Sequence, residues 1–157
     1  MLGRLFKLRA TLVKKLDKLG WLGPLLVRIT LGVVFVTSGW GKLHGLDDVT
    51  KFFDELHIPW PHFNAILAST TEFLGGLCIL VGLGTRLAAL PLAFTMLVAI
   101  ITAKRQAIEG VSSLLGFEEM TYLVAFLWLA FAGAGKASLD YVVASFADKY
   151  ATGSRSS

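Results

Sequence analysis

Charged residues are scarce over long stretches of this sequence, and the chain has a single cysteine. Charged side chains make up 17% of its 157 residues and hydrophobic ones 55%, and the mean hydropathy is +0.67. One soluble core of this size cannot hide so much apolar surface, which excludes an ordinary soluble domain. Cys78 has no partner for an intrachain disulfide, and its apolar surroundings in the sequence predict a small buried side chain.

Motifs for several kinds of chemistry are also missing. The spacing of His44, His57 and His62 matches no metal-binding pattern, so we expect no metal site. We find no phosphate-binding glycine loop, no Ser-His-Asp motif and no flavin, haem or iron–sulfur motif. The isoelectric point near 9.4 does not indicate nucleic-acid binding, because the basic residues do not interleave with aromatic ones.

Four apolar runs dominate the chain. A membrane-spanning helix needs about 17–25 such residues, and lipid offers no partners to an open backbone, so these runs are predicted to be helices. The fourth has only 16 residues and is expected to borrow a turn or to sit where the bilayer thins. The predicted fold is an all-α membrane protein with a four-transmembrane-helix bundle. The predicted spans are residues 22–43, 65–83, 87–103 and 120–135.

The ends of the chain differ from these runs. Residues 1–20 alternate leucines with basic residues at helical spacing, which predicts an amphipathic helix in the plane of the headgroups. The polar residues 150–157 are expected to be a disordered tail, and residues 1–157 to form one membrane domain. A further short amphipathic helix is predicted over residues 47–56, in the loop after the first span.

The basic residues predict the orientation. Ten of the fifteen lysines and arginines fall on the side that holds both termini, and four fall on the other side. Because cytoplasmic loops collect basic residues, both termini are predicted to lie in the cytoplasm.

Two residues of opposite charge fall inside the predicted spans. Arg28 lies about seven residues from the cytoplasmic end of the first span and Glu72 about eleven from that end of the second, an offset of about 6 Å. We therefore predict an intramembrane ion pair between them, on helix faces rich in small residues. A structural pair that fixes helix register, a binding site for a polar headgroup such as a quinone, and a proton relay all remain open. Glu118 and Glu119 are interpreted as a solvated helix start.

Several segments in order resemble the DoxX family of small bacterial membrane proteins. The resemblance covers about residues 24–143, and a minor departure is His57, where a glycine would be expected before Ile58-Pro59. The segments that carry it are residues 26–32 with Phe35, 38–43, 58–61, 72–77, 82–89 and 133–140.

The resemblance implies four spans in a bacterial cytoplasmic (inner) membrane. Some members are associated with thiosulfate:quinone oxidoreductase in archaea, and others with a mycobacterial membrane oxidoreductase complex linked to thiol and superoxide defence. It implies a quinone-interacting subunit that receives electrons from a soluble redox partner. The resemblance carries the family's arginine and glutamate onto Arg28 and Glu72 and implies a headgroup contact at the outer mouth for Lys42. Phe35 and Trp40 would then flank a quinone.

Other functions stay open from sequence alone. The main alternative is a non-catalytic anchor or assembly factor that holds partners through its loops and basic amino-terminal helix. A small transporter or lipid-binding protein is the third, which the lack of an evident repeat disfavours. Homo-oligomerisation is left open, and the lipid bilayer is the one partner that the composition requires.

Overall fold

The computed structural model describes residues 2–153, and every regular element within that range is helical. This confirms the predicted all-α class. The helices are α1 (Leu2–Leu19), α2 (Leu22–His44), α3 (Leu46–Glu55), α4 (Pro61–Val81), α5 (Thr85–Thr102), the 3-10 turn η1 (Arg105–Ala107), α6 (Val111–Leu115), α7 (Glu118–Ala132) and α8 (Leu139–Gly153).

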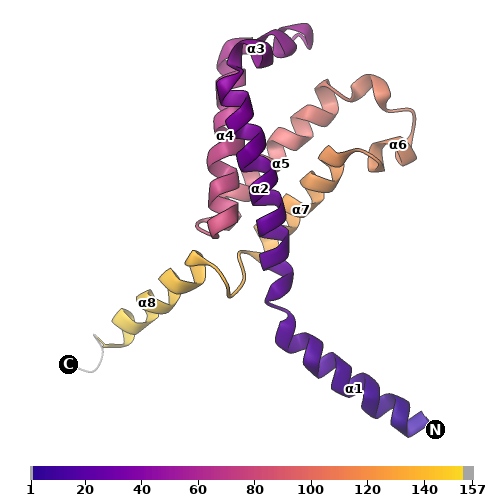
Figure 1. The fold of residues 1–157 in the computed structure, drawn as a ribbon, viewed down its shortest axis with the longest axis vertical. Helices are drawn as coiled ribbons and strands as arrows, with labels where there is room; N and C mark the ends of the chain where they lie inside the picture. Colours follow the sequence, from indigo (N-terminus) through magenta and orange to yellow (C-terminus); the bar gives the residue numbers. More distant parts are fainter. Residues whose placement is uncertain (1, 154–157) are drawn as a thin grey trace.

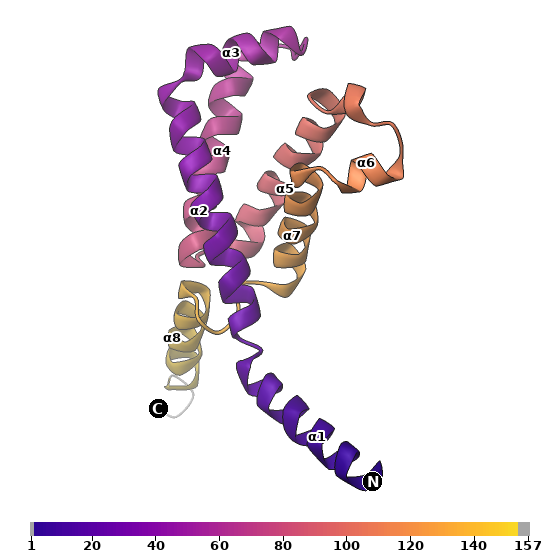
Figure 2. The same ribbon diagram turned by 45° about the vertical axis from the view of Figure 1, so that its right-hand side comes forward.

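The four apolar helices form two pairs rather than the compact bundle expected. Helix α2 packs along α4, and α5 packs along α7. The two pairs diverge from a common base like the arms of a V, with α3 at the open end (Figure 1). Turning the molecule shows the same two arms from another side (Figure 2). Helices α1 and α8 leave from the closed end of the V.

Among the residues that the structure describes, three helices are long and apolar enough to cross a membrane, namely α2, α4 and α5. Helix α7 has 15 residues, which gives a length of about 22 Å against the ~30 Å of hydrocarbon in a bilayer. The predicted fourth span is thus a real apolar helix, but its length alone does not make it a crossing. Helix α8 continues to Gly153, so the disorder expected from residue 150 is wrong for residues 150–153. The rest of the predicted tail, residues 154–157, lies outside the described residues.

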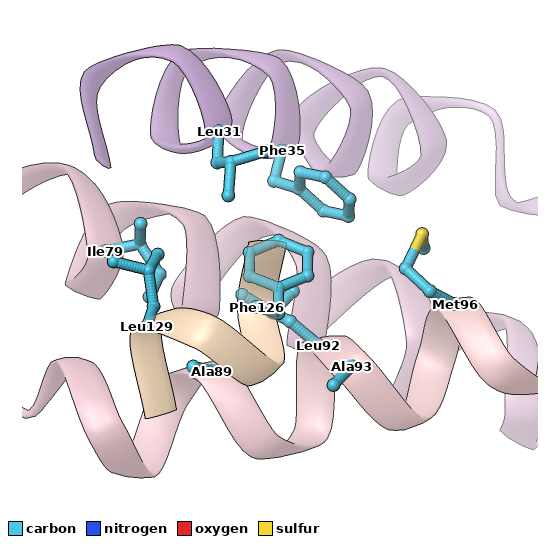
Figure 3. Packing of buried hydrophobic residues seen from close by; sticks show 9 residues of the cluster. All are labelled: Leu31, Phe35, Ile79, Ala89, Leu92, Ala93, Met96, Phe126 and Leu129. Carbon is cyan, nitrogen blue, oxygen red and sulfur yellow. The ribbon is translucent and has the colours of Figure 1, made fainter. Parts of the chain in front are cut away.

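The arms share a small core where they meet. Phe35 on α2 packs edge-on against Phe126 and Tyr122 on α7, with ring centroids 4.8 and 5.3 Å apart. Small residues on α5 let the arms approach there, and Figure 3 shows this cluster from close by. Its buried members are Leu31, Phe35, Ile79, Ala89, Leu92, Ala93, Met96, Phe126 and Leu129.

The α2–α4 arm depends on glycine at its contact. A Cβ atom added at Gly32 would lie 2.6 Å from Leu80 Cβ, and one added at Gly76 would lie 2.8 Å from the backbone nitrogen of Val36. Gly39 is packed as tightly against the backbone of α4. In lipid, where the hydrophobic effect does not drive helices together, such close contact supplies much of the attraction.

The departure at His57 has a structural counterpart. This residue ends the turn after α3 and has φ +56°, a left-handed conformation that glycine adopts freely and that costs a residue with a Cβ roughly 1–2 kcal/mol. Its amide N–H donates to the carbonyl of Asp54 at 2.9 Å, and that of Ile58 donates to Phe53 at 3.0 Å. The turn geometry therefore accounts for the glycine expected at this position.

Replacing Gly39 by alanine is predicted to destabilise the protein by about 1–3 kcal/mol, because the new methyl group must push the α2 and α4 backbones apart. Gly41→Ala is the matched control, since a Cβ at Gly41 meets nothing within 4 Å. The control should be neutral or slightly stabilising, as alanine favours helix. Unfolding by SDS titration in mixed micelles measures both, and equal effects would contradict the tight contact.

Candidate functional site

Glu72 lies in the middle of α4, and its partners come from the C-terminal half of α2. It is 2% exposed. Lys42 Nζ donates to both carboxylate oxygens, at 2.6 and 2.7 Å, and Ser38 Oγ donates to Oε2 at 3.0 Å. Ser38 and Lys42 are one helical turn apart, so they face the same way. The buried acid is therefore held by one cation and one hydroxyl group.

Arg28 makes a different set of contacts, at the other end of α2. It is 1% exposed, and its guanidinium donates to four backbone carbonyls. Two of them, Ile79 and Leu80, belong to the last turn of α4, where carbonyls lack partners within the helix. The other two, Ala134 and Ala137, belong to the segment between α7 and α8. The distances are 2.9 Å to Ile79, 3.1 Å to Leu80, 2.9 Å to Ala134 and 2.8 Å to Ala137.

The predicted ion pair between Arg28 and Glu72 is therefore wrong. Arg28 bonds at the level of Ile79, seven residues and about 10 Å along the helix axis from Glu72. The offset of about 6 Å expected from the sequence compares only the depths of the two backbone positions in the membrane. It does not include the direction in which each side chain extends. The Arg28 side chain extends towards the closed end of the V. Lys42, near the other end of α2, forms the ion pair with the Glu72 carboxylate.

Asp140 completes the structure around Arg28. Its carboxylate accepts the amide N–H groups of Gly84, at 2.7 Å, and Thr85, at 3.1 Å, which caps the start of α5. Its own N–H donates to the carbonyl of Gly82 at 2.9 Å. We call Arg28, Gly82 and Asp140 the basal clamp. The clamp joins α2, the α4–α5 turn and the start of α8. In the sequence, Asp140 stands out only as part of residues 133–140, which resemble DoxX proteins, and nothing there predicted these contacts.

A cavity of about 890 Å³ lies between the arms, with α3 beside its outer part. Aromatic and aliphatic side chains form most of its wall, including Phe35, Phe52, Phe53 and Phe94. The Lys42–Glu72 pair, with Ser38, forms one polar region of this wall. The volume is in the range of small-molecule sites, which are mostly apolar with a few placed polar groups.

A second polar region faces the cavity from the other arm. Lys104, just after α5, pairs with Glu119 on α7 at 3.3 Å. The Tyr122 hydroxyl group donates to Glu118 Oε2 at 3.5 Å. Both acids do stand in the first turn of α7, as expected of a helix start. Yet Glu119 is only partly exposed and both line the cavity, which the interpretation as a solvated start missed. No periodic signal marks this region, because Lys104 lies in a loop.

The other predicted contacts divide between the cavity and the surface. Of the three residues predicted to contact a quinone, Phe35 and Lys42 line the cavity, whereas Trp40 does not. Trp40 is 54% exposed and lies against Phe73, with ring centroids 5.5 Å apart. Helix α2 turns it away from the face that carries Ser38 and Lys42.

Two of the three histidines have side-chain contacts in separate places. His44 Nδ1 lies 2.9 Å from the carbonyl oxygen of Trp40, and His62 Nδ1 lies 3.3 Å from Thr50 Oγ1. Within residues 2–153 no three His, Cys, Asp or Glu side chains are grouped to hold a metal ion.

Comparison with known proteins gives a consistent family. The DoxX family model matches residues 23–105. The chain is 38% identical over 126 residues to the inner membrane protein YqjF of Escherichia coli K12, covering 80% of this chain and 95% of YqjF.

Two further relatives are 31% identical over 121 residues. One is the protein named "Putative oxidoreductase CatD" of Bacillus subtilis 168, and the alignment covers 76% of this chain and 85% of CatD. The other is the inner membrane protein YphA of E. coli K12, and the alignment covers 74% of this chain and 86% of YphA. No solved structure matches the chain significantly.

A double-mutant cycle distinguishes the two pairings of Glu72. Combining Glu72→Gln with Lys42→Met is predicted to show a coupling of about 1–3 kcal/mol, because the residues share one ion pair. Combining Glu72→Gln with Arg28→Lys is predicted to be additive within about 0.5 kcal/mol, because they share no partner. Free energies of unfolding from SDS titration give both values. Strong coupling between Arg28 and Glu72 would contradict the structure.

The basal clamp predicts unequal effects at two neighbouring glycines. Gly82 has φ +72° and Gly84 has φ +59°, so alanine is strained at both. A Cβ at Gly82 would in addition overlap the Arg28 guanidinium and approach Ser138 Cβ to 2.7 Å, whereas one at Gly84 meets nothing within 4 Å. Gly84→Ala is expected to cost about 1 kcal/mol and Gly82→Ala about 2–4 kcal/mol, since Arg28 loses hydrogen bonds. Thermal unfolding in detergent, followed by circular dichroism, checks the order.

Proposed function

This chain belongs to the DoxX family, and we propose that it is a quinone-interacting inner-membrane subunit of an oxidoreductase or redox-stress complex. The observation that carries the proposal is the ion pair between the partly exposed Lys42 and the buried Glu72 in the wall of a largely apolar cavity. A relative that shares 31% of aligned residues is named a putative oxidoreductase.

The cavity has the two features that a quinone needs. Phe35, Phe52 and Phe53 provide flat apolar surfaces against which a ring packs. Lys42 carries three N–H groups, and Glu72 accepts hydrogen bonds at two oxygens. An N–H of Lys42 donates to a ring oxygen, and Glu72 fixes the position of Lys42. Lys42 thus takes the role that the sequence suggested for Arg28.

Reduction of a quinone to a quinol consumes two electrons and two protons. The electrons come, in this proposal, from a soluble redox protein partner. On the α2–α4 arm, the described ionisable groups that line the cavity are Lys42 and Glu72. They are therefore the candidates to pass protons to the ring oxygens.

The proposed topology has four crossings with both termini in the cytoplasm. Helices α1 and α8 leave from the same end of the molecule (Figures 1 and 2), which requires an even number of crossings. Since α2, α4 and α5 are long enough to cross, α7 is the fourth, and its pairing with α5 supports this. The positive-inside rule then places the closed end of the V in the cytoplasm and the cavity mouth outside.

The role proposed for α1 is to lie on the inner leaflet. It holds six basic residues and one acidic residue, a balance that favours an anionic membrane surface. The same helix supports the second candidate function, a membrane anchor or assembly factor, because it and α8 extend from the closed end where a cytoplasmic partner would approach.

Quinone binding to the purified protein in a gentle detergent tests the proposal. Isothermal titration calorimetry with decylubiquinone is expected to show saturable binding that Lys42→Met weakens about tenfold, the effect of one lost charge-assisted hydrogen bond. Lys51→Met is the matched control, because Lys51 is exposed and lies outside the cavity wall.

A second variant separates loss of binding from loss of fold. The Ala99 side chain lines the cavity from α5 and belongs to neither ion pair, so Ala99→Phe should narrow the cavity and weaken binding while the protein stays folded. Absence of any quinone binding to the wild type would reject this function. Co-purification of a soluble partner that depends on residues 1–20 would then favour the anchor.

A further inference from the structure

The two sides of the cavity, one between α2 and α7 and the other between α4 and α5, differ in how open they are. On the α2–α7 side, Phe35 packs against Tyr122 with ring centroids 5.3 Å apart, and Phe35 is only 3% exposed although it lines the cavity. On the α4–α5 side, the wall includes Leu67 and Phe94, which are 52% and 66% exposed. Apolar side chains that line a cavity and stay so exposed border an opening. The cavity therefore opens sideways between α4 and α5.

The level of this opening follows from the packing of α4 against α5. A Cβ atom added at Gly75 would lie 2.9 Å from Leu92 Cγ, so these two residues face each other. One turn nearer the open end of the V, Glu72 and Phe94 lie at about the same level, because the helices are antiparallel. Leu67 lies about 7 Å further along α4. Six residues of α4 precede Leu67 and eight residues of α5 follow Phe94, so the opening lies within the apolar length of both helices.

The outer end of the cavity is less suited to hydrocarbon. Besides the Lys42–Glu72 pair, the charged residues of the described wall are Lys104, Glu118 and Glu119, at the outer end of the α5–α7 arm. Hydrocarbon against these groups would remove their water, which costs free energy. On the α4–α5 side, the wall residues from Leu67 to Thr71 and from Pro91 to Ala99 carry no charge. An apolar chain that starts at Glu72 is therefore favoured to leave between α4 and α5.

We infer that the ligand of this cavity carries a hydrocarbon tail, which leaves sideways between α4 and α5 across Leu67 and Phe94, while its polar head lies at Lys42 and Glu72. This inference rests on the proposed function. It narrows the ligand to an amphiphile that reaches the site from the lipid, in contrast to a small water-soluble ring that enters from the outer end.

Photoaffinity labelling locates the tail directly. The probe is decylubiquinone with a diazirine in the middle of the decyl tail, added to the detergent-purified full chain and illuminated. Peptide mapping by mass spectrometry is expected to find the label on α4 and α5, near Leu67 or Phe94, and excess unmodified decylubiquinone should remove it. Competed label on residues 104–119, or on α2 or α7, would overturn the inference.

Two matched pairs of variants test the opening by isothermal titration calorimetry. Leu67 and Leu74 lie two turns apart on one face of α4 and are both 52% exposed, but of the two only Leu67 lines the cavity. Leu67→Asn should weaken decylubiquinone binding about fivefold, because the tail removes water from the new amide. It should leave binding of ubiquinone-0, the same ring without the tail, unchanged. Leu74→Asn should alter neither.

The second pair is Phe94→Asn and Phe131→Asn. Both phenylalanines are exposed, and of the two only Phe94 lines the cavity. Phe94→Asn should weaken binding of the tailed ring, and Phe131→Asn should not. Circular dichroism confirms that each variant is folded.

The outcomes separate the two proposals. Binding of neither ring, with or without the tail, would reject the proposed function and this inference together. Binding of decylubiquinone that is weakened equally by Leu67→Asn and Leu74→Asn would reject the inference alone. So would a Leu67→Asn variant that weakens the tailless ring as much as the tailed one, because Leu67 would then contact the head.

Discussion

Lipid cannot form hydrogen bonds, so every charged group inside this protein must find its partners within the chain. Arg28 meets this requirement with four backbone carbonyls, and Glu72 meets it with Lys42 and Ser38. An arginine has five N–H donors in a rigid fork and suits several carbonyls at a helix end. A lysine is a compact point charge and suits a carboxylate. Arg28 therefore joins helices at the amino-terminal end of α2. Lys42 forms an ion pair in the cavity wall near the carboxyl-terminal end.

The two ends of the α2–α4 arm consequently have different properties. At the closed end of the V, the basal clamp ties α2 to the α4–α5 turn and to the start of α8 through buried hydrogen bonds. Towards the open end the arms diverge, and the space between them is the cavity. A rigid base with separated arms allows polar groups from both arms to face one ligand. It also explains why the cavity holds two separate ion pairs, each formed within its own arm.

The small residues matter because of where they bring the backbones together. Gly32, Gly39 and Gly76 allow α2 and α4 to touch, which brings Lys42 within reach of Glu72. The aromatic contact of Phe35 with Tyr122 and Phe126 joins the arms at the wall of the cavity. Packing and polar pairing thus lie on the same face of α2, and a change to one affects the other.

The sequence by itself determined the class of fold and the extent of the apolar helices. The runs predicted at residues 22–43, 65–83, 87–103 and 120–135 correspond to α2, α4, α5 and α7 within about four residues at each end, because apolar length and turn residues are local properties. The stripes of small residues and the importance of Arg28 and Glu72 were also local inferences, since each charge stands out within one apolar run, whereas the roles of Lys42 and Phe35 came with the DoxX resemblance.

Tertiary structure alone decided which charges meet. Pairing depends on the relative depth and rotation of two helices and on the direction in which each long side chain extends, and none of these is encoded in spacing along one segment. The same limit hid the pair of Lys104 and Glu119, which joins the loop after α5 to α7 in the wall of the cavity. It also left Trp40 on the surface, because a residue two positions from Ser38 lies about 200° around the helix axis, away from the face that lines the cavity.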